Sequence, residues 1–181
     1  MKEEDLYKLR FPIGVFIKPK TITEKHISSW IIAIENLPKS IESLTNNLNT
    51  NALNYKYRPD GWTIKQVVHH CADSHINSLV RFKLTLTEKQ PIIRPYFEDR
   101  FAKLTDYSEP IDASLLILKG VHNKLSVLLR NLNREELDLK FTHPEHSKNF
   151  SLKETIGMYA WHSNHHLEHI KQALKFKDKF G

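Results

Sequence analysis

The sequence predicts an all-α protein, a four-helix bundle with long loops between its helices. Four segments repeat apolar residues every three or four positions, the spacing that places them on one face of a helix. Three of these segments open with a capping box, in which Ser or Thr is followed three residues later by Glu or Gln. No series of alternating apolar and polar residues indicates a sheet. Bundles of this kind often hold metal ligands on facing helices.

The composition predicts a single domain spanning residues 1–181. A chain of 181 residues that is 40% hydrophobic can bury one sizeable core. Its one cysteine, Cys71, excludes disulfides and cysteine-rich zinc sites and fits a reducing compartment. The first residues lack the apolar core of a signal peptide, and no stretch approaches the roughly 18 apolar residues of a membrane span. We therefore expect a soluble cytoplasmic protein without a membrane partner.

The formal net charge of +6 and the isoelectric point near 9.3 raise the question of nucleic-acid binding. The lysines are scattered, however, and the densest group lies at the C-terminus: Lys171, Lys175, Lys177 and Lys179. Cations there suit the negative end of a helix dipole, so a solvated helix end is the simpler interpretation. Nucleic acid is not an expected partner.

The first helix follows an arm, residues 1–20, in which Pro12, Gly14 and Pro19 predict irregular structure. Thr21-x-x-Glu24 is the capping box that should open the helix. Its apolar seam comprises Trp30, Ile34, Leu37, Ile41, Leu44 and Leu48. Pro38 lies within this seam and should kink the helix.

The second helix should begin at the box Thr63-x-x-Gln66 and run to about Thr87. Cys71 and His75 fall on its apolar stripe, which predicts that both fill the core. Residues 88–111 then form a connection rich in proline and aromatic residues, long enough to predict a lid or binding segment.

The third helix should span Asp112 to Leu132, and its apolar face is rich in leucine. A polar connection, residues 133–150, follows it. Ser151-x-x-Glu154 is the box that should open the fourth helix, which extends to about Lys177.

The fourth helix carries the most informative motif, with His162, His165, His166 and His169 inside eight residues. Residues four apart share a helix face, with Cβ atoms roughly 5–6 Å apart. At about 100° per residue, His162 and His166 flank the edge of the apolar face, whereas His165 points about 80–100° away. His169 lies near the rim and could orient a ligand. Asn164 should face solvent.

A third ligand should come from the second helix, at either His69 or His70. His70 shares a polar stripe with Ser74, Asn77 and Arg81, as expected of a face lining a pocket. His69 should pack or face solvent. The geometry favours His70 without excluding His69. Three histidines with an open coordination position are typical of catalytic rather than structural zinc-type sites; the alternative is a surface histidine stripe without chemistry.

Several blocks resemble the YfiT branch of the DinB-like proteins, in matching order from Pro12 to His169. They are Tyr57–His70, Ala72–Ser78, Arg81–Leu84, Ile93–Tyr96 and Trp161–Ser163. The resemblance implies a dimeric four-helix bundle and a metal-dependent hydrolase with one zinc or nickel ion per chain. Relatives in the wider superfamily are S-transferases and isomerases that use bacillithiol, mycothiol or glutathione.

The family's three-histidine pattern falls on His70, His162 and His166. Close relatives often carry another histidine where this chain has Asn164. Because Asn164 should point away from the site, the difference does not affect the implied ligand set.

Such a site could activate either water or a small thiol, because a bound divalent ion lowers the pKa of both. The sequence lacks the HExxH pattern of metalloproteases, and Glu168 should face outward. Arg81 and Arg94 could each bind a carboxylate of a thiol cosubstrate or form a surface ion pair. The alternatives to an enzyme are a non-catalytic metal- or ligand-binding bundle and, on charge alone, a nucleic-acid-associated protein.

Overall fold

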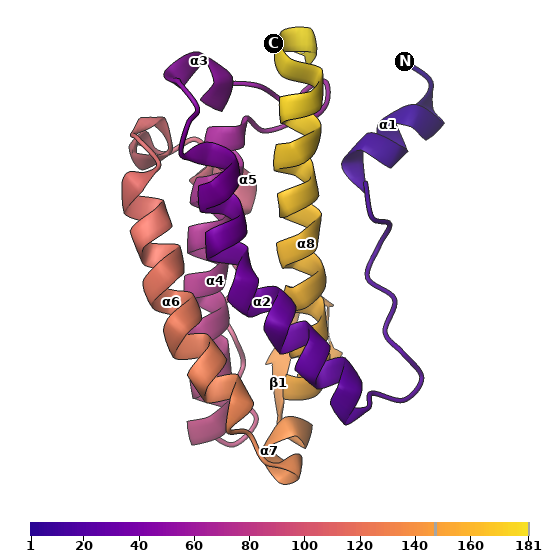
Figure 1. The fold of residues 1–181 in the computed structure, drawn as a ribbon. Coiled ribbons are helices and arrows are strands. Elements are labelled where there is room, and N and C mark those ends of the chain that lie inside the picture. Colours follow the sequence, from indigo (N-terminus) through magenta and orange to yellow (C-terminus); the bar gives the residue numbers. More distant parts are fainter. Residues whose placement is uncertain (147, 181) are drawn as a thin grey trace.

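The computed structural model describes residues 1–146 and 148–180, and within them four long helices form the bundle (Figure 1). These helices are α2 (Glu24–Thr45), α4 (Ile64–Thr87), α6 (Asp112–Arg130) and α8 (Leu152–Phe176). The shorter elements are α1 (Glu3–Arg10), α3 (Thr50–Leu53), α5 (Glu98–Phe101), η1 (Thr105–Ser108), α7 (Arg134–Asp138), β1 (Lys140–His143), η2 (Pro144–His146), β2 (Lys148–Ser151) and η3 (Lys177–Phe180). The predicted all-α four-helix fold is confirmed.

Consecutive helices of the bundle are not all neighbours. Helix α2 packs against α8 and α6, and α4 packs against the same two helices, so α2 and α4 occupy opposite corners. Figure 1 shows α2 and α8 running in one direction and α4 and α6 in the other. The neighbours α4 and α8 are therefore antiparallel. This arrangement brings the first half of α4 beside the second half of α8, where the histidine motif lies.

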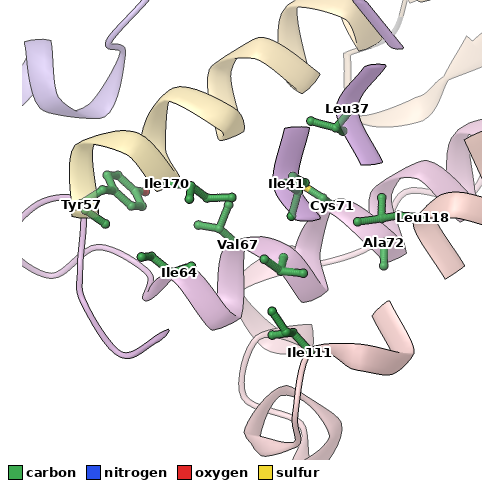
Figure 2. Close-up of a cluster of buried hydrophobic side chains, with 12 residues drawn as sticks. Leu37, Ile41, Tyr57, Ile64, Val67, Cys71, Ala72, Ile111, Leu118 and Ile170 are labelled. Atoms are coloured by element: carbon green, nitrogen blue, oxygen red, sulfur yellow. The ribbon is translucent and has the colours of Figure 1, made fainter. Parts of the chain in front are cut away.

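The core contains a cluster of apolar side chains contributed by all four long helices (Figure 2). Its members include Leu37, Ile41, Val67, Leu118 and Ile170, each at most 2% exposed. Cys71 is fully buried in the same cluster, and this burial raises the pKa of its thiol above its ordinary value. The predicted core position of Cys71 is confirmed, and its protonated, inaccessible thiol has no role as a nucleophile.

Two of the three predicted capping boxes are confirmed, at Thr63 and at Ser151. The first prediction is wrong: α2 is capped by Thr23, whose backbone N–H donates to Nδ1 of His26. An imidazole nitrogen thus performs the task that the sequence pattern assigns to a carboxylate. The helix continues through Pro38, and its axis changes direction along its length (Figure 1).

The arm and the connections between the long helices hold structure that the periodicity did not predict. The arm contains α1, whose acidic first turn and basic last turn complement the helix dipole. The connection between α6 and α8 contains an antiparallel hairpin of β1 and β2, in which Phe141 lies opposite Phe150 with ring centroids 5.9 Å apart. Strands of four residues are too short to show a clear alternation, and this aromatic pair stabilises the hairpin. No helix among the described residues has the length and apolarity needed to cross a bilayer.

Candidate metal centre

A cavity of about 630 Å³ opens between α4 and α8. The loop before α4, the hairpin and residues 95–99 close its sides, and Arg10 and Phe11 of the arm reach it. The prediction that residues 88–111 form a binding segment agrees with this placement, because Pro95 and Tyr96 line the cavity. The backbone N–H of Ile93 donates to the carbonyl of Thr142, which holds this segment against β1.

His70 of α4 and the pair His162 and His166 of α8 converge on this cavity. Nε2 of His70 lies 3.1 Å from Nε2 of His162. The ring centroids of His70 and His166 are 4.6 Å apart, and those of His162 and His166 are 4.5 Å apart. One potential ligand nitrogen from each ring lies within 4.8 Å of the other two. The antiparallel contact of α4 and α8 therefore assembles the three histidines that the sequence singled out.

His69 is not part of this group, although it is the neighbour of His70. Its Nδ1 lies 2.8 Å from the hydroxyl oxygen of Ser114, and its Nε2 lies 3.2 Å from the carbonyl oxygen of Glu109. A carbonyl only accepts, so Nε2 carries the proton and Nδ1 accepts from the serine hydroxyl. Both ring nitrogens are occupied. Of the two alternatives left open by the sequence, the geometry places His70 at the cavity.

Hydrogen bonds from the arm determine the tautomer of His166. Nε2 of His169 donates to the carbonyl oxygen of Arg10 over 3.1 Å, which leaves Nδ1 of His169 as an acceptor. That acceptor lies 3.4 Å from Nδ1 of His166. A proton on Nδ1 of His166 leaves the lone pair of its Nε2 free. Tyr57 stacks on His169 with centroids 3.7 Å apart and holds the ring in place. His169 therefore orients His166, a role that the sequence left open.

His75 contacts the ring nitrogen of His162 that faces away from His70. Nε2 of His75 lies 3.2 Å from Nδ1 of His162. When Nδ1 of His162 donates to it, Nε2 of His162 keeps its lone pair toward His70. The predicted burial of His75 is confirmed, but its contact with His162 was not predicted. His75 lies on the apolar stripe of α4, and helical periodicity alone gives no signal that distinguishes a core filler from a partner of a ligand.

All three converging histidines are held neutral. Burial lowers the pKa of His70 to about 4. Burial also lowers the pKa of His162 and of His166 well below the ordinary value, and the neighbouring imidazoles add to this effect. A metal ligand must be an unprotonated imidazole. The site is therefore in the ligand-competent protonation state at neutral pH.

His165 lies outside the first group, on the face of α8 that the arm covers. The ring of His165 is buried between two aromatic rings. Its centroid lies 5.9 Å from that of Phe11 and 4.5 Å from that of Trp161, on which it stacks. The cause is the arm, which covers the face of α8 that a bare helix would expose. His165, His166 and His169 also bring ligand nitrogens within 4.8 Å of one another. This second group is the weaker candidate, because the hydrogen bonds of His169 to Arg10 and His166 occupy both of its nitrogens.

The donor set at the first group fits a divalent metal ion. Zn–N bonds of about 2.0–2.1 Å in a tetrahedral site separate two ligand nitrogens by about 3.3 Å. The 3.1 Å between the Nε2 atoms of His70 and His162 agrees with that separation. The group contains three imidazoles and no carboxylate, and all three rings line the cavity. As predicted, Asn164 is exposed, and Glu168 pairs with Lys171 at 3.0 Å.

The two arginines singled out by the sequence have different positions. Arg81 lines the cavity, and its Nη1 donates to the hydroxyl of Tyr159 over 3.1 Å. Arg94 is exposed and is not among the residues lining the cavity. In the described part of the chain, none of the ion pairs involves either arginine. The surface ion pair considered for Arg81 is not formed.

A family model, curated proteins and a solved structure all resemble this chain over most of its length. The model of the DinB superfamily matches residues 33–170. A Bacillus cereus protein named "Putative metal-dependent hydrolase" is 46% identical over 167 residues, which cover 92% of this chain and 96% of that protein. A Bacillus thuringiensis protein of the same description has the same identity and coverage. A solved structure, described as "YfiT from Bacillus subtilis is a probable metal-dependent hydrolase with an unusual four-helix bundle topology", superposes with a TM-score of 0.89 at 37% identity, covering 93% of this chain and 97% of that one.

Proposed function

This chain belongs to the DinB superfamily, and from that premise we propose that it is a metal-dependent enzyme in which His70, His162 and His166 hold one divalent ion per chain. The observation that supports the proposal most strongly is the convergence of three neutral imidazoles, one potential ligand nitrogen from each, at the wall of an open cavity. Zinc or nickel suits this all-nitrogen donor set.

An ion bound there would lower the pKa of a water or a small thiol, so the site would serve either hydrolysis or thiol transfer. The chain itself supplies orientation: His169 sets the tautomer of His166, and Nε2 of His75 contacts Nδ1 of His162. Tyr57, Trp62 and Phe141 give the cavity apolar walls beside these polar groups, as expected for a small-molecule substrate.

Hydrolysis agrees with the names of the relatives, and one observation favours thiol transfer as a second candidate. The converging group holds no carboxylate that could serve as a general base for water. The acids that line the cavity, Asp60, Glu98, Asp99 and Glu145, are all exposed. A thiol needs no such base, since coordination alone deprotonates it. A low-molecular-weight thiol such as bacillithiol is therefore a proposed cosubstrate.

The proposed oligomeric state is a homodimer, and the proposed location is the cytoplasm.

The test is turnover with the metal restored. Purified protein loaded with zinc or nickel is assayed against ester and amide substrates, and against small thiols paired with epoxides or alkyl halides. We expect turnover in one of these two sets, and none in His162→Ala or after chelation. Asn164→Ala is the matched control on the same helix, since its exposed side chain lies outside the site. Full turnover by His162→Ala would contradict the proposal. A metal-loaded protein with no exchangeable coordination position would instead indicate a non-catalytic binding bundle.

A further inference from the structure

The charge of Arg81 faces the same cavity as the three histidines. Arg81 follows His70 by three turns of α4, and both residues line the cavity. Its partner Tyr159 lies on α8 three residues before His162, and the ring centroids of Tyr159 and His162 are 5.8 Å apart. The guanidinium therefore lies on the same side of the bundle as the proposed metal ligands, beyond Tyr159.

No group in the described part of the chain neutralises this charge. Arg81 takes part in none of the ion pairs found there, and its Nε is buried without a hydrogen-bond partner. Glu98 and Asp99 line the cavity but are exposed and do not pair with it. A guanidinium does not lose its proton in proteins, so it cannot escape the cost of burial by becoming neutral. A partly buried cation without an acid is costly unless a ligand supplies the anion.

Two neutral hydroxyls lie beside Arg81. Tyr159 accepts a hydrogen bond from it, and the hydroxyl of Tyr96, which hydrogen-bonds Ser74, is close enough to feel its charge. A single guanidinium beside phenol hydroxyls matches the single charge and two oxygens of a carboxylate, which Arg binds with two parallel hydrogen bonds. A phosphate dianion carries two negative charges, and the single guanidinium would neutralise only one of them.

We propose that Arg81 binds the carboxylate of a small acid whose reacting end lies at the three-histidine centre. This inference rests on the proposed function and names its substrate class. Eleven residues of helix separate the Cα atoms of His70 and Arg81 by about 16 Å. Because helical side chains point back toward the N-terminus, the guanidinium of Arg81 lies on the order of 10 Å from the three-histidine group. The site therefore selects carboxylic acids, or thiols bearing a carboxylate, that are several bonds long.

The test uses two thiols of equal length, 6-mercaptohexanoate and 6-mercaptohexan-1-ol, titrated calorimetrically into zinc-loaded protein. We expect the acid to bind at least tenfold more tightly than the alcohol. Arg81→Gln should remove this preference by weakening acid binding alone. Arg81→Lys keeps the charge but loses the paired N–H donors of the guanidinium, so its preference for the acid should be intermediate. Arg94→Gln is the matched control, because Arg94 is an exposed arginine outside the cavity. Equal binding of the two thiols by the wild type, or a preference retained in Arg81→Gln, would overturn the proposal.

Two further measurements separate this inference from the proposed function. Titration of the metal-free protein with hexanoate and hexan-1-ol measures the carboxylate preference without any metal. In the cobalt-loaded protein, a sulfur-to-metal charge-transfer band reports whether the thiol reaches the ion. A preference that depends on Arg81 without that band would support the carboxylate site and contradict thiol activation. If Arg81→Gln does not fold, as judged by circular dichroism, the wild-type preference and Arg81→Lys decide the matter.

Discussion

Two sets of buried histidines in this bundle have the same charge state but different geometry. His70, His162 and His166 bring ligand nitrogens together at a cavity wall. His75 and His122 are at most 2% exposed, and their rings stack face to face with centroids 4.6 Å apart and an interplanar angle of 17°. Nδ1 of His122 donates to the carbonyl oxygen of Ile34. Stacked rings direct their nitrogens past one another, so this pair offers no common point for an ion.

The difference shows that burial makes a histidine neutral, whereas the direction of its free nitrogen makes it a potential ligand. Burial lowers the pKa of His122 to about 4, as it does for His70. Protonation state therefore does not separate the two sets. The two sets differ because only the nitrogens of His70, His162 and His166 converge at an open cavity.

The strongest way to break this comparison is to remove one member of each set. We expect His166→Ala to lose the bound metal, with a fall in affinity larger than the 10–100-fold typical of changes to groups that support a ligand. His122→Ala should keep the metal and lose stability instead, by about 2–5 kcal/mol, as expected for a large-to-small change in a core. Metal affinity and urea denaturation of the two variants measure both effects. Equal metal loss in both would contradict the distinction.

Acid should destabilise the metal-free protein through both sets. Histidine has an ordinary pKa of 6.5, and burial lowers the pKa of His70 and of His122 to about 4. As pH falls below about 6.5 the unfolded rings take up protons first, so stability is lost between pH 6.5 and 4. Each histidine contributes about 1.4 kcal/mol per pH unit in that window. Denaturation of metal-free protein at pH 7 and pH 5 measures the loss; constant stability would show that these rings titrate normally.

A smaller effect should follow from changing a partner of a ligand. His75→Phe keeps an aromatic ring in the core but removes the nitrogen that hydrogen-bonds Nδ1 of His162. We expect metal affinity to fall about 10–100-fold while one ion per chain still binds at saturation. Competition with a chelating indicator measures the change. Phe82→Leu, a change at a fully buried core position, is the control and should leave affinity unaltered.

The smallest effect is expected at Asn164, the exposed position of the motif. Asn164→His adds a fifth histidine to the segment, yet its ring should lie in solvent. We expect the metal stoichiometry to stay at one per chain and the stability to change by less than about 0.5 kcal/mol. Elemental analysis and thermal melting measure these quantities. A second equivalent of metal would show that composition, not direction, controls binding.

The helices could be predicted because their signals are local. Thr63 and Ser151 begin helices with side-chain hydrogen bonds that span three residues, and apolar spacing marks the core face of each helix. The polar stripe that His70 shares with Ser74 and Arg81 favoured His70 over His69 without excluding His69, and all three residues of that stripe line the cavity.

What the sequence did not predict depends on contacts between distant segments. His165 is buried because Phe11 of the arm packs on it, and no property of α8 alone indicates that cover. His75 meets His162 across the bundle, which depends on the antiparallel pairing of α4 and α8. The hairpin depends on Phe141 packing opposite Phe150, a pairing too short to appear as an alternating pattern.

The most direct test compares the two adjacent histidines of α4. His69 has both nitrogens occupied by Ser114 and Glu109, whereas Nε2 of His70 faces His162. Elemental analysis of wild type, His70→Ala and His69→Ala, each reconstituted with zinc or nickel and desalted, measures the ion bound per chain. The account predicts about one ion in the wild type and in His69→Ala, and none in His70→Ala. No metal in the wild type, or retention in His70→Ala, would contradict the three-histidine centre.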